Sequence, residues 1–203
     1  MPGQGYPGKL SMIVRLVAAL LSVVLLASCA KNDLDDPKAD LGDFRLGLNI
    51  VVADNMKKVP ISRDATVEEW EAAMVKAIDD RFGRYTESGT KFYNFAVSVD
   101  GYALAPPGIP IVAAPKSILV ISVSIFDDAT ATVINPEEKG KQFTVFEESS
   151  GKTLIGSGLT QTKEEQIANL SEAAAKQIEA WMRDNREWFG LPPKPKGYVR
   201  PEG

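Results

Sequence analysis

Histidine is absent from the 203 residues of this chain, and cysteine occurs once, at position 29. The chain therefore has no imidazole that could act as a general base, a nucleophile or a metal ligand. A single cysteine can form neither a disulfide within the chain nor a thiolate zinc cluster. The acidic stretch from Ala30 to Asp43 could hold calcium, but it lacks the glycine and the closing bidentate glutamate of a loop site. We expect no metal site and no cofactor.

Basic residues are outnumbered, because 23 lysines and arginines stand against 27 acidic residues, a net charge of −4. Residues 1–28 contain Lys9 and Arg15 and no acid, which leaves 21 basic and 27 acidic residues and a net charge of −6 from Cys29 onward. Nucleic-acid binding requires a basic face, and adhesion to anionic lipid requires basic clusters. The composition therefore argues against both.

The amino-terminal apolar run is too short for a permanent membrane span. It reaches from Leu16 to Leu26 and is interrupted only by Ser22. As a helix it would measure about 16 Å at 1.5 Å per residue, against the ~30 Å hydrocarbon core of a bilayer. With Arg15 before it and small residues after it, the run has the three-part layout of a secretory signal. Either Met1 or Met12 fits as its start, and residues 1–11 look like upstream sequence.

The run ends in Leu26-Ala27-Ser28-Cys29, which resembles the lipobox of bacterial lipoproteins. The resemblance implies that residues 1–28 are removed and that Cys29 becomes a lipidated amino terminus. Several acyl chains on one residue give stable anchoring. Ala30 is not aspartate, and by analogy with the family's sorting rule this implies the periplasmic face of the outer membrane. The alternative is a buried helix with a structural cysteine, but such a helix would carry polar residues at helical spacing.

The chain after Cys29 begins with a polar, acidic stretch, and we expect residues 29–43 to form a flexible tether. From Phe44 to Ala53 apolar and polar residues alternate, which predicts a half-buried strand. The alternation predicts one set facing the core: Phe44, Leu46, Leu48, Ile50 and Val52. The other set is predicted to face outward: Arg45, Gly47, Asn49 and Val51.

Two capping boxes predict where helices begin. Thr66 with Glu69, and Thr162 with Glu165, place a hydroxyl and a glutamate three residues apart ahead of apolar residues at helical spacing. The first helix is predicted over 66–83, and the second from 162 to about 186. Trp70 could be an exposed anchor for a partner, but its place in the apolar stripe favours packing in the core.

Further strands are predicted over 92–104 and 117–126, the second with the apolar start typical of a central strand. A hairpin is predicted from 130–134 and 142–147, and a short strand over 152–157. The order is β-α-β-β-β(β)-α. We therefore expect an α+β fold with one antiparallel or mixed sheet of four to six strands and two amphipathic helices on one face. The globular domain is predicted over 44–189, followed by a proline-rich tail over 190–203.

Catalytic residues are hard to find in this sequence. Adjacent carboxylates point to different sides of a strand or helix, so none of the four acidic pairs forms an evident acid–base couple: Asp79-Asp80, Asp127-Asp128, Glu137-Glu138 and Glu147-Glu148. The serines have no histidine partner, and no spacing suggests a Ser-Lys arrangement. We therefore predict that the chain is not an enzyme.

Two segments suit binding. The loop from Ala105 to Pro115 is long, apolar and rich in proline, whereas most loops are polar. Its candidate binding residues are Pro107, Ile109, Ile111 and Val112. The loop would contact a partner or lipid, or else serve as a flap over the core. In the tail, Pro192 to Pro195 fits an extended proline ligand, with a disordered end as the alternative.

The lipobox, the short tether and the compact α+β domain together resemble the small envelope lipoproteins that assist transport or assembly systems. Examples are the auxiliary lipoproteins of lipid-transporting ABC systems and the lipoprotein partner of the lipopolysaccharide-assembly barrel. The resemblance implies a noncatalytic accessory protein with a membrane anchor and an envelope protein as partner. The alternatives are a binder of a small ligand or lipid, and an enzyme that uses carboxylates alone. An enclosed apolar pocket would favour the binder, and a filled core with an exposed apolar patch would favour the accessory protein.

Overall fold

A computed structural model describes residues 33–107, 117–147 and 160–194. It divides into two units, one ending at Pro37 and one beginning at Lys38. In the first unit the described residues contain only a short 3-10 helix, η1 (Asp33–Asp35). The second unit includes residues 38–43 of the predicted tether. Leu41 is buried there, so this part of the predicted tether packs against the domain.

The second unit is an α+β domain with one mixed sheet of six strands. The strands are β1 (Arg45–Val52), β2 (Lys57–Lys58), β3 (Phe92–Ala103), β4 (Ile118–Asp127), β5 (Thr132–Val133) and β6 (Lys141–Phe146). The helices are α2 (Val67–Phe82) and α5 (Lys163–Asp184), with the 3-10 turns η2 (Gly83–Tyr85) and η4 (Arg186–Phe189). The predicted fold class is confirmed, although the two-residue strand β2 was not predicted.

The sheet is built around two long antiparallel strands, β3 and β4. β1 and β2 both pair with β3 and run parallel to it. On the other side, β5 and β6 both pair with β4. β4 is thus a central strand, as its apolar start predicted. The hairpin prediction was wrong in its pairing, because β5 and β6 each pair with β4 rather than with one another.

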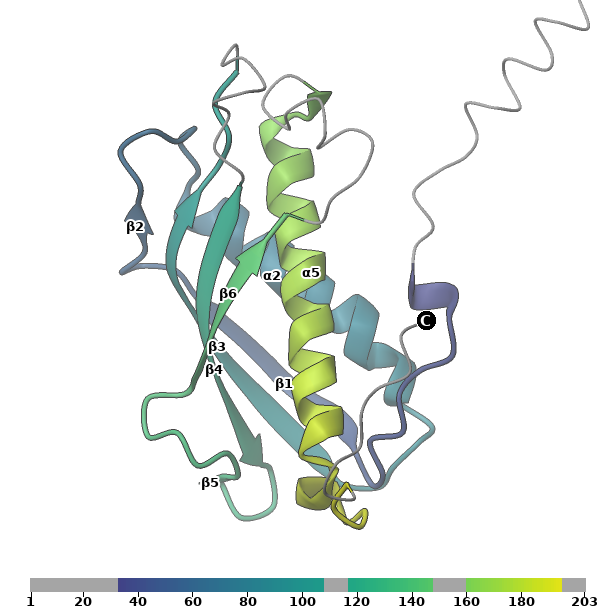
Figure 1. Ribbon diagram of the computed structural model, residues 1–203. Coiled ribbons are helices and arrows are strands. Elements are labelled where there is room, and N and C mark those ends of the chain that lie inside the picture. Colours follow the sequence, from purple (N-terminus) through teal and green to yellow (C-terminus); the bar gives the residue numbers. More distant parts are fainter. Residues whose placement is uncertain (1–32, 108–116, 148–159, 195–203) are drawn as a thin grey trace, which may run out of the picture. The chain divides into compact units, whose positions relative to one another are not determined.

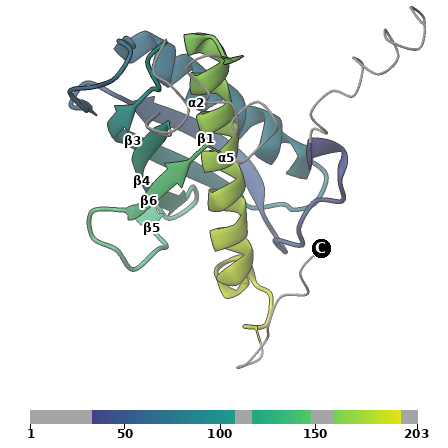
Figure 2. The same ribbon diagram turned by 45° about the horizontal axis from the view of Figure 1, so that its top comes forward.

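Both helices lie on one face of the sheet and pack against each other (Figures 1 and 2). The ring of Phe82 on α2 lies 4.9 Å from that of Phe95 on β3. Trp181 on α5 meets Phe143 on β6 at 5.6 Å. Phe95 and Phe143 point to the same side of the sheet, because both pair with odd-numbered residues of β4. We call this side the helix face and the opposite side the open face.

Local sequence sets where the helices begin. Thr66 accepts a hydrogen bond from the backbone of Glu69, whose carboxylate accepts one from the Thr66 N–H. Thr162 and Glu165 form the same pair ahead of α5. Each box satisfies two backbone donors that a helix start leaves without an intrahelical acceptor. Both predicted starts are confirmed.

Large side chains fill the layer between the helices and the sheet. Trp70, Met74, Phe82 and Ile178 are fully buried from the helices, and Phe95, Leu119, Ile121 and Val123 are buried below them. Trp70 stacks obliquely on Tyr102 with 5.3 Å between ring centroids. Trp70 is therefore a core residue, as its place in the apolar stripe predicted.

Candidate interaction surface

Large exposed apolar side chains gather away from the helices. Among the described residues, eight large hydrophobic side chains are exposed: Leu48, Ile50, Val52, Val59, Ile61, Phe92, Val133 and Phe146. All of them belong to strands or to the segments beside strands, and none belongs to α2 or α5. Large exposed apolar patches mark sites of interaction far more often than scattered single residues do.

A β-bulge produces the densest part of this surface. Leu46 pairs with Tyr93 and Asn49 pairs with Phe95, so two residues of β1 lie opposite Asn94 alone. The Leu48 N–H donates to the Asn94 side-chain oxygen at 2.7 Å. A side chain at Gly47 would come within 2.3 Å of that same oxygen. Asn94 and Gly47 therefore fix the position of the extra residue.

The bulge reverses the predicted facing of the rest of β1, so the prediction that Leu48, Ile50 and Val52 face the core was wrong. These three are 62%, 54% and 46% exposed, and we call them the β1 strip. Val51, predicted to face outward, is buried instead. The physical reason is that an inserted residue shifts a period-two pattern by one step.

Asn49 shows the same reversal from the helix side. Predicted to face outward, it donates to the carbonyl of Val75 at 3.0 Å and to the carboxylate of Asp79 at 3.3 Å, both on α2. Asn49 thus lies on the helix face and makes polar contacts there. Without the bulge, the alternation along β1 would place an aliphatic residue on that face.

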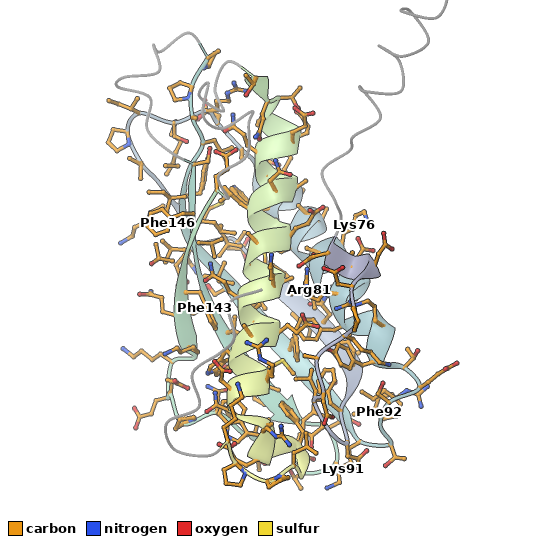
Figure 3. The ribbon with its side chains drawn as sticks, turned by 45° about the vertical axis from the view of Figure 1, so that its right-hand side comes forward. Lys76, Arg81, Lys91, Phe92, Phe143 and Phe146 are labelled. Atoms are coloured by element: carbon orange, nitrogen blue, oxygen red, sulfur yellow. The ribbon has the colours of Figure 1, made fainter. Side chains whose placement is uncertain are left out.

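Small and hydroxyl-bearing side chains occupy the middle of the open face. Ala96 and Ser98 on β3 lie opposite Ser124 and Ser122 on β4. Asp100 accepts a hydrogen bond from Ser122 at 2.6 Å, so the carboxylate is held against the sheet. At the far margin Phe146 is 53% exposed and points away from the helices, because its neighbour Val145 is buried on the helix face (Figure 3). The open face is therefore apolar at its margins and nearly free of charge in its middle.

The predicted binding loop is only partly within the described residues. Pro107 is exposed at its start, and Ile109, Ile111 and Val112 lie outside the described residues. The two ends of the loop are joined to α5 by a buried network. Ser117 donates to Gln166 at 3.0 Å and accepts from the Ala105 N–H at 3.2 Å, and Gln166 donates to the Ala105 carbonyl at 3.3 Å.

The carboxylates of Asp79, Asp80, Asp127, Asp128 and Glu137 have separate structural partners. Asp79 accepts from Asn49, while Asp80 pairs with Lys76 in the adjacent turn. Asp127 accepts from the Thr130 N–H at 3.0 Å and Asp128 from Asn94 at 2.7 Å. Glu137 accepts from Asn135. Glu147 is buried, its backbone N–H donates to the Ser117 carbonyl, and one of its carboxylate oxygens has no hydrogen-bond partner among the described residues. Glu148 lies outside the described residues.

A buried ion cluster joins the two helices. Glu179 of α5 accepts hydrogen bonds from Arg81 at 2.8 Å, from Arg84 at 3.0 Å and from the Tyr85 hydroxyl at 2.6 Å. Figure 3 shows Arg81 between α2 and α5. Burial, reinforced by the bond to Glu179, raises the pKa of Tyr85, so this hydroxyl stays protonated and donates. The cluster joins Arg81 of α2 and the η2 turn to α5 and so holds the helices together.

The described segments contain no group of three or more acidic, histidine or cysteine side chains arranged to hold a metal ion. Within the same segments, no helix has both the length and the apolar character that crossing a membrane demands. Cys29, with the rest of the lipobox and the predicted signal, lies outside the described residues, as does the predicted strand over 152–157.

Comparison with known proteins yields no matching family model and no matching curated protein. Several solved structures are similar. A DUF330-family protein from Xanthomonas campestris is 13% identical, with 75% of this chain and 90% of that chain covered and a TM-score of 0.41. A candidate lipoprotein from Caulobacter crescentus is 11% identical, with 66% and 91% covered and a TM-score of 0.37. PelC from Paraburkholderia phytofirmans, a dodecamer, is 9% identical, with 70% and 91% covered and a TM-score of 0.34. At such identities and TM-scores, this similarity indicates neither the function nor the partners of the chain.

Proposed function

We propose that this chain is a lipid-anchored, noncatalytic accessory protein of the bacterial cell envelope, which binds a partner protein through the open face of its sheet. The observation that carries the proposal is the one-sided exposure of large apolar side chains, centred on the β1 strip. Burial of the exposed part of each of these three side chains against a partner would contribute about 1 kcal/mol per side chain to the binding free energy. Phe146 extends the same surface at the opposite margin.

The anchor in this proposal is lipid on Cys29, supported by the lipobox Leu26-Ala27-Ser28-Cys29. Ala30 supports a location on the periplasmic face of the outer membrane. Intact mass and membrane partitioning of wild type and Cys29→Ala test the anchor. We expect a mature form beginning at Cys29 with added acyl mass, lost in the variant. An unlipidated, soluble wild type would refute this half of the proposal.

The rival function, binding of a small ligand or lipid between helices and sheet, has less support. The described part of that layer is filled by buried side chains such as Trp70 and Phe82. An enzyme acting through carboxylates alone has less support still, because Asp79, Asp80, Asp127 and Asp128 each contact a separate structural partner. The filled layer and the exposed strip instead favour an accessory protein that binds another protein.

Partner binding is tested by charging the β1 strip. Ile50→Lys places a cation on the open face at a position 54% exposed, and Ala168→Lys places one on the exposed side of α5 as a control. Both variants are crosslinked in intact cells and purified from the envelope. We expect a defined crosslinked complex with wild type and with Ala168→Lys, and its loss with Ile50→Lys. A complex that Ile50→Lys leaves intact would exclude the β1 strip as the binding surface.

A further inference from the structure

The chain enters the folded domain at one end of the sheet. Lys38 donates to the carbonyl of Arg84 at 3.0 Å and bonds to the Ser88 hydroxyl. Asp43 accepts from the Thr90 and Lys91 backbone, the second bond at 3.2 Å. These contacts hold residues 38–43 against the segment that leads into β3. Eight residues separate Cys29 from Lys38, and fully extended they allow a reach of about 30 Å.

A largely apolar corner lies at this same end. Phe92, the first residue of β3, is 43% exposed, and the Arg45 side chain lies over its ring at 5.0 Å. Val133 is 45% exposed and pairs with Phe126 at the end of β4. We call Arg45, Phe92, Phe126 and Val133 the tether-side corner. Figure 3 shows Phe92 beside Lys91, far along the sheet from Phe146.

The turn that leads to Val133 adds to this surface. Ala129, Thr130, Ala131 and Thr132 are all exposed and carry no charge. Around the corner lie the cations Arg45 and Lys91 and the anions Asp43, Asp127 and Asp128, so positive charge is not in excess there. This surface is therefore not expected to attract anionic lipid. An aromatic ring, an aliphatic side chain and a long basic side chain are instead the composition that suits the headgroup region of a bilayer.

We propose that, in the anchored protein, the tether-side corner rests on the surface of the bilayer that holds the lipid of Cys29. Phe92 and Val133 lie among the headgroups, and Arg45 reaches the phosphates. The inference rests on the lipid anchor proposed above, because a tether of this length holds the corner close to the membrane. The corner contacts the bilayer through apolar side chains, so zwitterionic phospholipid suffices. The β1 strip and Phe146 remain available to a protein partner.

The test uses a photo-crosslinking amino acid placed at Val133 or at Val59. Val59 is a matched control because it is 49% exposed and lies at the other end of the sheet, where its N–H bonds to the Tyr102 carbonyl. Each chain is attached to phosphatidylcholine vesicles in two ways: as the lipoprotein purified from cells, and by coupling the Cys29 thiol, the only one in the chain, to a maleimide-bearing lipid. Phospholipid adducts are counted by mass spectrometry after irradiation.

We expect adducts at Val133 to exceed those at Val59 several-fold, at low and at high salt alike. Phe92→Ser should reduce the Val133 adducts. Equal or absent adducts at the two positions in the maleimide-coupled chain would overturn the inference. If only the preparation from cells lacks acyl mass and fails to bind vesicles, the proposed lipid anchor fails, while the coupled chain still decides the corner. A yield at Val133 that collapses at high salt would contradict apolar contact.

Discussion

Replacing Glu179 with alanine should destabilise the domain more than removing any exposed ion pair. Its side chain is 12% exposed, and its carboxylate accepts three hydrogen bonds, from two guanidinium groups and one phenol. Removing one member of a buried ion pair costs about 3–5 kcal/mol, because the remaining charges lose their compensation. Arg81, at 5% side-chain exposure, is the more deeply buried cation. We therefore expect Glu179→Ala to lower the free energy of unfolding by about 3–5 kcal/mol.

The assay is urea unfolding of purified chains, followed by far-ultraviolet circular dichroism. The midpoint should fall while the slope with urea stays that of wild type, which indicates that the same surface is exposed on unfolding. The control is Asp80→Ala, which removes an i,i+4 pair with Lys76 whose partners are 73% and 42% exposed. That variant should unfold close to wild type, because exposed pairs contribute little. A Glu179→Ala midpoint as close to wild type as that of Asp80→Ala would refute the role given to the cluster.

Three further predictions concern single positions. Thr66→Ala removes the N-cap of α2 and should cost about 1 kcal/mol in urea unfolding, whereas Thr66→Ser should keep most of it. Gly47→Ala should be destabilising because the new carbon would lie 2.3 Å from the Asn94 oxygen, while Gly83→Ala meets nothing within 4 Å and should leave the melting temperature unchanged or higher; equal effects would contradict the packing at the bulge. The hydrogen bond from the Thr90 N–H, with a second from the Lys91 N–H, lowers the pKa of Asp43 below its ordinary 3.8. The contribution of Asp43 to stability is therefore present above about pH 4 and is lost as the pH falls through the lowered value. Asp43→Asn should therefore flatten the acid limb of a stability–pH curve, and an unchanged limb would show that the carboxylate is not responsible.

The helices could be predicted because their signals are local. Each helix begins with a capping box, Thr66 with Glu69 or Thr162 with Glu165, which lies within its first turn. An apolar stripe follows each box in the sequence. The long central strands were predicted for a similar reason, since buried residues alternate from Tyr93 to Val99 on β3 and from Leu119 to Ile125 on β4. Strand β2 is only two residues long, and two lysines form no alternating pattern from which a strand could be predicted.

The candidate surface could not be predicted, because it depends on a contact between distant residues. Read alone, β1 shows a clean alternation that places Ile50 and Val52 in the core. The bulge that overturns this pattern is held by Asn94, 46 residues away from Leu48. The signal that could have suggested it is Gly47, because glycine within a strand often marks a bulge. β5 pairs with β4 across the short turn after Asp127, whereas the pairing of β6 with β4 depends on tertiary contacts that the predicted hairpin does not contain.

The network of Ser117, Gln166 and the Ala105 backbone has a consequence for how this protein can vary. Because both ends of the 106–116 segment are fastened to α5 independently of what lies between them, the segment can change length at little cost. Doubling a flexible loop costs only about 0.6 kcal/mol of closure entropy. Insertions there should be tolerated as long as Gln166 and Ser117 are kept, which makes this segment the place to graft a new recognition sequence onto the domain.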